Sequence, residues 1–182
     1  MVPTLHIGRV LSYLDEVDHS KDDYLKYMST GIQQTYKGRI DRVKNATDKQ
    51  VADRKALDQF FGKLAYKLSV NGVSLLAGSD SGAYNSYTYP GISLHKELEA
   101  MVNIGMSPLN ALKTSAYNGA KFLKQDEDYG TISEGQIADI VLLNRNPLED
   151  IKNTQDIFMV LSNGNQHSKS DLNHLLNSAI VN

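Results

Sequence analysis

The sequence predicts an α/β protein made of two βα units, of the kind that builds a (β/α)8 barrel, followed by strands of a small β domain. Two apolar extended segments, 1–7 and 73–77, are each followed by helical periodicity, and short β-type segments replace the helices after Gly130. Eight such units need roughly 250 residues, so a chain of 182 residues holds only part of a barrel. We place the barrel units at 1–125 and the β domain with its tail at 126–182.

The first predicted unit opens with a strand at 1–7, because Pro3 biases the residue before it toward β geometry. A charged loop follows, and Ser20 is a candidate N-cap for a helix. A longer helix is predicted over about 48–70, and Asn71-Gly72 ends it. Its apolar side chains recur at helical spacing on one face: Leu57, Phe60, Phe61, Leu64 and Leu68.

The second unit begins with a buried strand at 73–77, which presents Asp80 between two glycines. A loop rich in tyrosine and glycine follows, and a helix is predicted over about 92–104. Ser107-Pro108 places an N-cap before a proline at the first helical position, which predicts a helix to about Tyr117. Asn-Pro and Asn-Gly turns then separate β-type segments at 137–143 and 157–162.

Composition excludes several classes of function. Nineteen basic against 21 acidic residues give a net charge of −2, which argues against a nucleic-acid binder. Cysteine is absent, which excludes a thiol nucleophile and a cysteine zinc site. The sequence has no apolar run long enough to span a membrane, and no signal peptide is visible. These features favour a cytoplasmic location without fixing the compartment.

Asp80 is the leading candidate for chemistry, because the carboxyl-terminal ends of barrel strands are where active sites lie. A carboxylate is a hard anionic ligand for a metal, and it can accept and return a proton. The alternative is an aspartate that caps the turn after a strand. The segment from Gly78 to Gly82 is not a serine-hydrolase elbow, because its central residue is aspartate.

Five motifs in this order resemble the C-terminal part of a metal-dependent amidohydrolase, in the imidazolonepropionase-like and prolidase-like branch. They are Gly72–Gly82, Gly91–Leu98, Gly105–Leu112, Gly130–Leu143 and Asn146–Asp150. The resemblance implies the last two βα units of the barrel and hydrolysis of a C–N bond in a small amide, cyclic amide or dipeptide. It also implies that Asp80 binds a divalent metal, zinc by preference, and takes the proton from the attacking water.

The resemblance also suggests substrate-binding residues. His95 and Tyr84 are candidates, with a hydrogen-bonded surface histidine and an exposed loop tyrosine as the alternatives. His6 follows the first predicted strand, so it either faces the mouth of the site or is an ordinary loop histidine.

The chain departs from the family's pattern of metal ligands. None of its histidines forms a His-x-His pair: they are His6, His19, His95, His167 and His174. Because a catalytic zinc needs about three protein ligands, we expect the isolated chain to hold no metal tightly. The alternative function is a non-catalytic fragment or interaction module. It would self-associate as a homo-oligomer through an unpaired strand edge and the unpartnered faces of Val73, Leu75 and Ala77.

Overall fold

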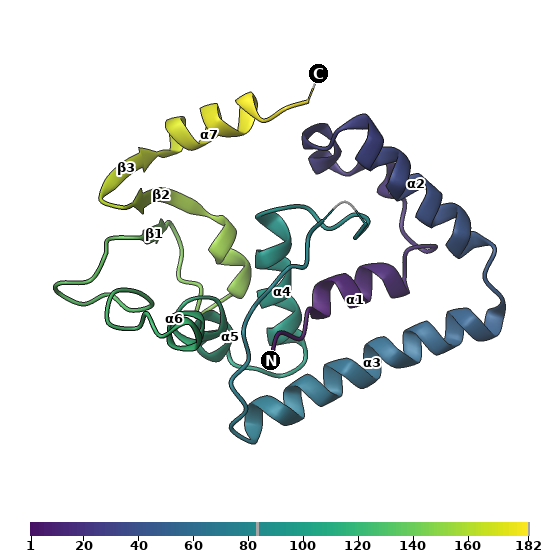
Figure 1. Ribbon diagram of the computed structural model, residues 1–182, viewed down its shortest axis with the longest axis horizontal. Helices are drawn as coiled ribbons and strands as arrows, with labels where there is room; N and C mark the ends of the chain where they lie inside the picture. Colours follow the sequence, from purple (N-terminus) through teal and green to yellow (C-terminus); the bar gives the residue numbers. More distant parts are fainter. Residues whose placement is uncertain (83, 182) are drawn as a thin grey trace.

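The computed structural model describes residues 1–82 and 84–181. Helices dominate the first two-thirds of the chain, and a small sheet lies near the C-terminus (Figure 1). The helices of this first part are α1 (Leu5–Ser12), α2 (Thr30–Lys44), α3 (Asp48–Val70), α4 (Ile92–Asn103), α5 (Pro108–Ser115) and α6 (Tyr117–Leu123). Two 3-10 turns, η1 (His19–Lys21) and η2 (Asp23–Tyr27), connect α1 to α2. No helix of the described residues is long and apolar enough to cross a bilayer.

The helices predicted over about 48–70 and after Ser107-Pro108 are both present. α3 begins with a capping box in which the side chains of Thr47 and Gln50 each accept a backbone N–H of the other residue. α3 ends at Val70, and Gly72 adopts a left-handed φ of 81°. α5 begins at Pro108, where the Ser107 side chain accepts the Asn110 N–H. Both helices therefore begin at caps supplied by residues close to them in sequence.

The main core forms where α1, α3, α4 and α5 meet. α1 lies between α3 and α4 in Figure 1, and α4 occupies the centre of the molecule. Gly62 permits the approach of α3 to the end of α4, since a Cβ there would meet Ile104 Cγ2 at 3.2 Å. The buried residues of this core are Leu5, Ala65, Leu75, Leu98, Met101, Met106, Ala111 and Ile151.

A second, aromatic core joins the segment around α2 to the loop that follows Asp80. Its buried members are Leu14, Tyr36, Tyr87 and Tyr89. Tyr36 comes from α2, whereas Tyr87 and Tyr89 come from the loop. The two segments are about fifty residues apart in sequence, so this cluster is what holds them together.

The C-terminal sheet is antiparallel, with strand order β1 (Ile140–Leu143), β2 (Ile157–Ser162) and β3 (Asn165–Ser168). A 3-10 turn, η3 (Ile151–Gln155), precedes β2, and α7 (Lys169–Ser178) follows β3. The sequence predicted β1 and β2 and missed β3. The Asp139 side chain, just before β1, accepts the Asn163 N–H at 2.6 Å in the β2–β3 turn.

The prediction of barrel strands at 1–7 and 73–77 is wrong, because neither segment forms a regular strand. Residues 5–12 form α1, because Ile7, Leu11 and Leu14 follow helical spacing, and residues 73–77 form no strand. The two segments make a single pair of hydrogen bonds with the pattern of parallel strands. The Met1 amine donates to the Ser74 carbonyl at 3.0 Å, and the Leu76 N–H donates to the Met1 carbonyl at 2.8 Å. The fold is thus mixed α/β with a small antiparallel sheet.

Two further expectations fail in detail. The helix expected after Ser20 is replaced by η1 and η2, so the α-helix starts only at Thr30. Leu75 was expected to lack a partner, but it is 2% exposed and belongs to the main core. Val73 does remain exposed. The division at residues 125 and 126 stays a prediction.

Candidate functional site

The candidate site starts from the extended segment that leads to Asp80. Beyond the pair of hydrogen bonds with Met1, the Ala77 N–H donates to the Thr114 carbonyl at 3.0 Å, and Asn118 Nδ2 donates to the Leu75 carbonyl at 2.9 Å. α5 and α6 therefore hold the segment on the side opposite Met1. A Cβ on Gly78 would lie 2.7 Å from Val2 Cγ1, so any other residue at this crossing would force Val2 or the segment to shift.

Asp80 ends this segment, and its side chain is exposed to solvent. Its φ of 50° is in the left-handed region, which aspartate tolerates better than most residues. Asn85 Nδ2 donates to the Asp80 carbonyl at 2.6 Å, which closes the turn behind it. The structure places Asp80 where the sequence put it, at the exposed end of an extended segment. Its catalytic role stays a prediction.

The tyrosines of the following loop divide into two environments. Tyr84 is 79% exposed, which leaves its ring open to a ligand or to water. Tyr87 and Tyr89 are buried in the aromatic core. We therefore assign the buried pair, Tyr87 and Tyr89, to packing. Substrate binding by Tyr84 stays a prediction.

A histidine–aspartate pair supports the buried loop tyrosines. His19 Nδ1 lies 2.9 Å from Asp22 Oδ2, and the His19 ring stacks on Tyr87 with centroids 4.3 Å apart. The Tyr89 hydroxyl donates to the same Asp22 oxygen at 2.8 Å. Burial, with help from Asp22, raises the pKa of Tyr89, so the phenol keeps the proton that it donates. The pair therefore anchors the loop after Asp80 to the η1–η2 segment.

His95 lies in the first turns of α4, and its side chain is turned toward η3. Its Nδ1 is 3.0 Å from Thr154 Oγ1, and that hydroxyl donates its proton to the Ile151 carbonyl at 2.8 Å. Because the threonine proton is already used, His95 must carry its own proton on Nδ1, and Nε2 keeps a lone pair. Burial lowers the pKa of His95, which keeps the ring neutral near pH 7. Substrate binding by His95 stays a prediction.

Glu97 is a key residue that sequence reasoning missed. It is completely buried, and its two carboxylate oxygens accept the N–H groups of Leu5 at 2.9 Å and of His6 at 2.7 Å. It thereby caps α1, whose own N-cap residue Thr4 makes no side-chain cap bond. Burial raises the pKa of Glu97, against the two backbone N–H groups, which lower it. One signal for this role was available in the sequence: Glu97 lies four positions before Met101, so it shares the buried face of the same helix.

His6 belongs to a different part of the protein surface from Asp80. It lies on α1 and lines a groove between α1, α3 and α4, which Asp80 does not line. Burial and the Lys96 charge lower the pKa of His6.

Among residues 1–82 and 84–181, no group of three or more histidine, aspartate or glutamate side chains is placed to hold an ion. The donor set around Asp80 does not by itself fit a metal.

The family is established by comparison with known proteins. A model of the amidohydrolase family matches residues 62–167, which include Asp80, His95 and Glu97. The chain belongs to the amidohydrolase family. No curated protein matches the chain.

Solved structures extend the likeness to the fold. A bottromycin amidohydrolase superposes with a TM-score of 0.78 at 21% identity, covering 98% of this chain and 39% of its own. A putative prolidase from Bifidobacterium longum superposes with a TM-score of 0.65 at 23% identity, and the match covers 99% of this chain and 39% of the prolidase. A Xaa-Pro dipeptidase with bound methionine superposes with a TM-score of 0.64 at 19% identity, and the match covers 92% of this chain and 34% of the dipeptidase. The chain thus spans less than two-fifths of these proteins.

Proposed function

We propose that this chain provides the C-terminal part of a metal-dependent amidohydrolase that hydrolyses a C–N bond in a small amide, cyclic amide or dipeptide. The observation that carries the proposal is Asp80, an exposed carboxylate in a left-handed turn at the end of an extended segment, inside the region that matches the family. Two of the structural relatives are named for dipeptide or prolidase activity, which supports dipeptides as the first substrates to test.

In this proposal Asp80 moves one proton. It accepts the proton from water as the water oxygen forms a bond to the substrate carbonyl carbon. It then returns that proton to the nitrogen as the C–N bond breaks, which leaves a carboxylic acid and an amine. His95, through the lone pair on Nε2, and the Tyr84 hydroxyl would bind and orient the substrate.

A divalent ion, zinc by our expectation, would take Asp80 as one ligand in the complete enzyme. The described residues do not supply the rest of a metal centre. Zinc sites with catalytic roles use about three protein ligands. The remaining ligands would therefore have to come from outside this set, and the isolated chain should lose added zinc to a chelator.

The test is an assay of the chain with Xaa-Pro dipeptides and N-acyl amino acids, with and without added zinc. Asp80→Asn keeps the shape of the side chain and removes its basicity; Asp126→Asn, also exposed, is the matched control. Turnover that Asp80→Asn abolishes and Asp126→Asn preserves supports the proposal. Turnover that survives in Asp80→Asn removes Asp80 from the mechanism. A chain inert on every substrate is also what the incomplete set of metal ligands in the described residues predicts, so in that case the association test below is the one that bears on the second candidate.

The second candidate is a non-catalytic module that self-associates. The feature that favours it is the apolar face of α3, where Leu57, Phe60 and Phe61 are each about half exposed. Neighbouring exposed apolar side chains of this size often mark an interaction surface. Light scattering at micromolar concentration tests it. A dimer that Phe61→Glu dissociates and Lys63→Glu does not dissociate supports association through this face, and a monomeric wild-type chain refutes it.

A further inference from the structure

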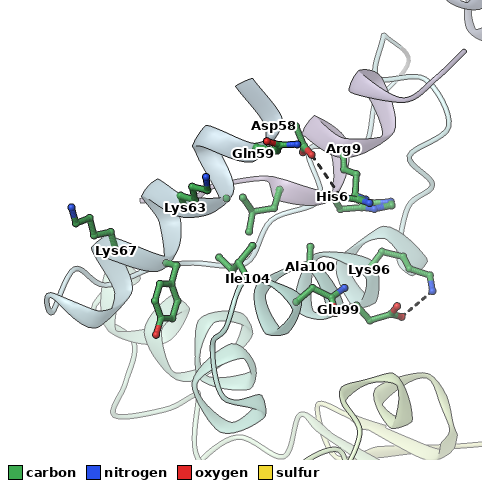
Figure 2. Close-up of a pocket in the computed structure, with 14 residues that line it drawn as sticks. His6, Arg9, Asp58, Gln59, Lys63, Lys67, Lys96, Glu99, Ala100 and Ile104 are labelled. Atoms are coloured by element: carbon green, nitrogen blue, oxygen red, sulfur yellow. Dashed lines mark hydrogen bonds and ion pairs between the residues drawn. The ribbon is translucent and has the colours of Figure 1, made fainter. Parts of the chain in front are cut away.

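A groove between α1, α3 and α4 has the size of a small-molecule site (Figure 2). Its volume is about 850 Å³, within the usual range for ligand pockets. Its floor is apolar and is formed by Leu5, Gly62, Tyr66, Ala100 and Ile104. At Gly62 α3 packs closely on the end of α4, since a Cβ there would meet Ile104 Cγ2 at 3.2 Å, and this contact closes the bottom of the groove.

The rim of the groove carries an excess of positive charge. Arg9 pairs with Asp58 at 3.7 Å, and Lys96 pairs with Glu99 at 2.9 Å, so these four charges cancel within the site. Lys63 and Lys67 also line the groove, one helical turn apart on α3. In the part of the chain that the structure describes, neither has a carboxylate within ion-pair distance. The groove is therefore positive in a chain whose net charge is −2.

His6 adds a hydrogen-bonding group but no charge to the wall of the groove. Its pKa is lowered by burial and by Lys96, so the ring is neutral near pH 7. Burial raises the pKa of the Asp58 carboxyl and the Arg9 charge lowers it, and the carboxylate remains the partner of Arg9. The positive excess of the groove therefore lies with the two lysines. Their long side chains can lie over apolar surface while the ammonium groups stay in water.

We propose that this groove binds a small amphipathic carboxylate, with its apolar body on the floor and its carboxylate held by Lys63 and Lys67. An apolar floor calls for a hydrocarbon or ring, and two unpaired ammonium groups at one edge call for an anion. Asp80 does not line the groove, so this site is separate from the proposed hydrolytic site and does not depend on it.

The test is an NMR titration of the 15N-labelled full chain with octanoate and with octanamide, its neutral analogue. We expect octanoate to give saturable shifts at amides of α1, α3 and α4, and octanamide to bind at least fivefold more weakly. Removing either lysine charge should lower the affinity for octanoate by about three- to fivefold, which is the size of effect measured for surface charge pairs. Added salt should lower the affinity for octanoate and leave the affinity for octanamide unchanged.

The decisive variant is Lys63→Gln with Lys67→Gln, compared with Lys49→Gln on the same helix. All three lysines are exposed, so the changes should leave the fold intact. The proposal requires that the double variant lose about tenfold in octanoate affinity and that Lys49→Gln lose none. The proposal is overturned if octanoate and octanamide bind equally well, or if neither binds. It is also overturned if the double variant binds octanoate as the wild type does, or if the shifted amides lie outside the groove.

Discussion

Replacing Glu97 by glutamine tests the most consequential contact in the fold. The glutamine carbonyl oxygen can accept one of the two N–H groups of Leu5 and His6, but its NH2 group cannot accept the other. One buried backbone donor is therefore left without an acceptor at the start of α1. Such a donor costs about 1–3 kcal/mol, so we expect Glu97→Gln to lower the free energy of unfolding by that amount.

Truncation to alanine removes both acceptors and also leaves the volume of a fully buried side chain unfilled. We expect Glu97→Ala to destabilise by about 2–5 kcal/mol, since two donors are orphaned while a buried charge is relieved. Glu127→Gln is the matched control, because Glu127 is exposed, and its effect should stay within about 0.5 kcal/mol. Urea unfolding monitored by circular dichroism gives all three values. Equal midpoints for Glu97→Gln and Glu127→Gln would refute the capping role.

The same variant predicts a dependence on pH. Because burial raises the pKa of Glu97 above 4.5 in the folded chain, the folded state holds this proton more tightly than the unfolded state. The stability contributed by Glu97 is thus full below that value and falls as pH rises through the folded pKa. Glu97→Gln cannot titrate, so the stability difference between wild type and variant should shrink as pH rises across this window. A difference that is constant with pH would contradict the raised pKa.

Two further predictions concern the loop and the segment that carries Asp80. Gly78→Ala should destabilise by about 1–3 kcal/mol, because its Cβ would overlap Val2, whereas Gly38→Ala in α2 meets open space and should stabilise by about 0.5–1 kcal/mol. Urea midpoints of the two glycine variants that move in the same direction would contradict this prediction. Tyr89→Phe removes the hydrogen bond to Asp22 and should lower the free energy of unfolding by about 1 kcal/mol, whereas Tyr24→Phe should change it little. Equal losses of stability in the two tyrosine variants would show that the hydrogen bond contributes nothing.

Local signals in the sequence predicted the elements that local chemistry determines. The cap at Ser107-Pro108, the end of α3 at Asn71-Gly72 and the strand at 157–162 depend on residues close in sequence, and all three are present. The family was predicted in the same way from ordered motifs, and the match over 62–167 confirms it.

The errors arose where distant residues decide the structure. The first residues were read as a strand from the bias of Pro3, whereas the acceptor at the start of α1 is Glu97, about ninety positions later. The segment at 73–77 has the composition of a buried strand, but its N–H and C=O groups are bound mainly by Met1, Thr114 and Asn118 rather than by long neighbouring strands. The His19–Asp22–Tyr89 arrangement lay in a stretch that looked like a solvated charged loop.

The cap on α1 also has a consequence for synthesis on the ribosome. Leu5 emerges first, but its acceptor Glu97 lies 92 residues further along the chain. At the usual rate of translation this interval is roughly 5 to 20 seconds. During that time the start of α1 has only water to satisfy its N–H groups, and a helix of 8 residues is too short to persist alone. The N-terminal segment should therefore stay unstructured on the nascent chain and dock only after α4 has left the exit tunnel.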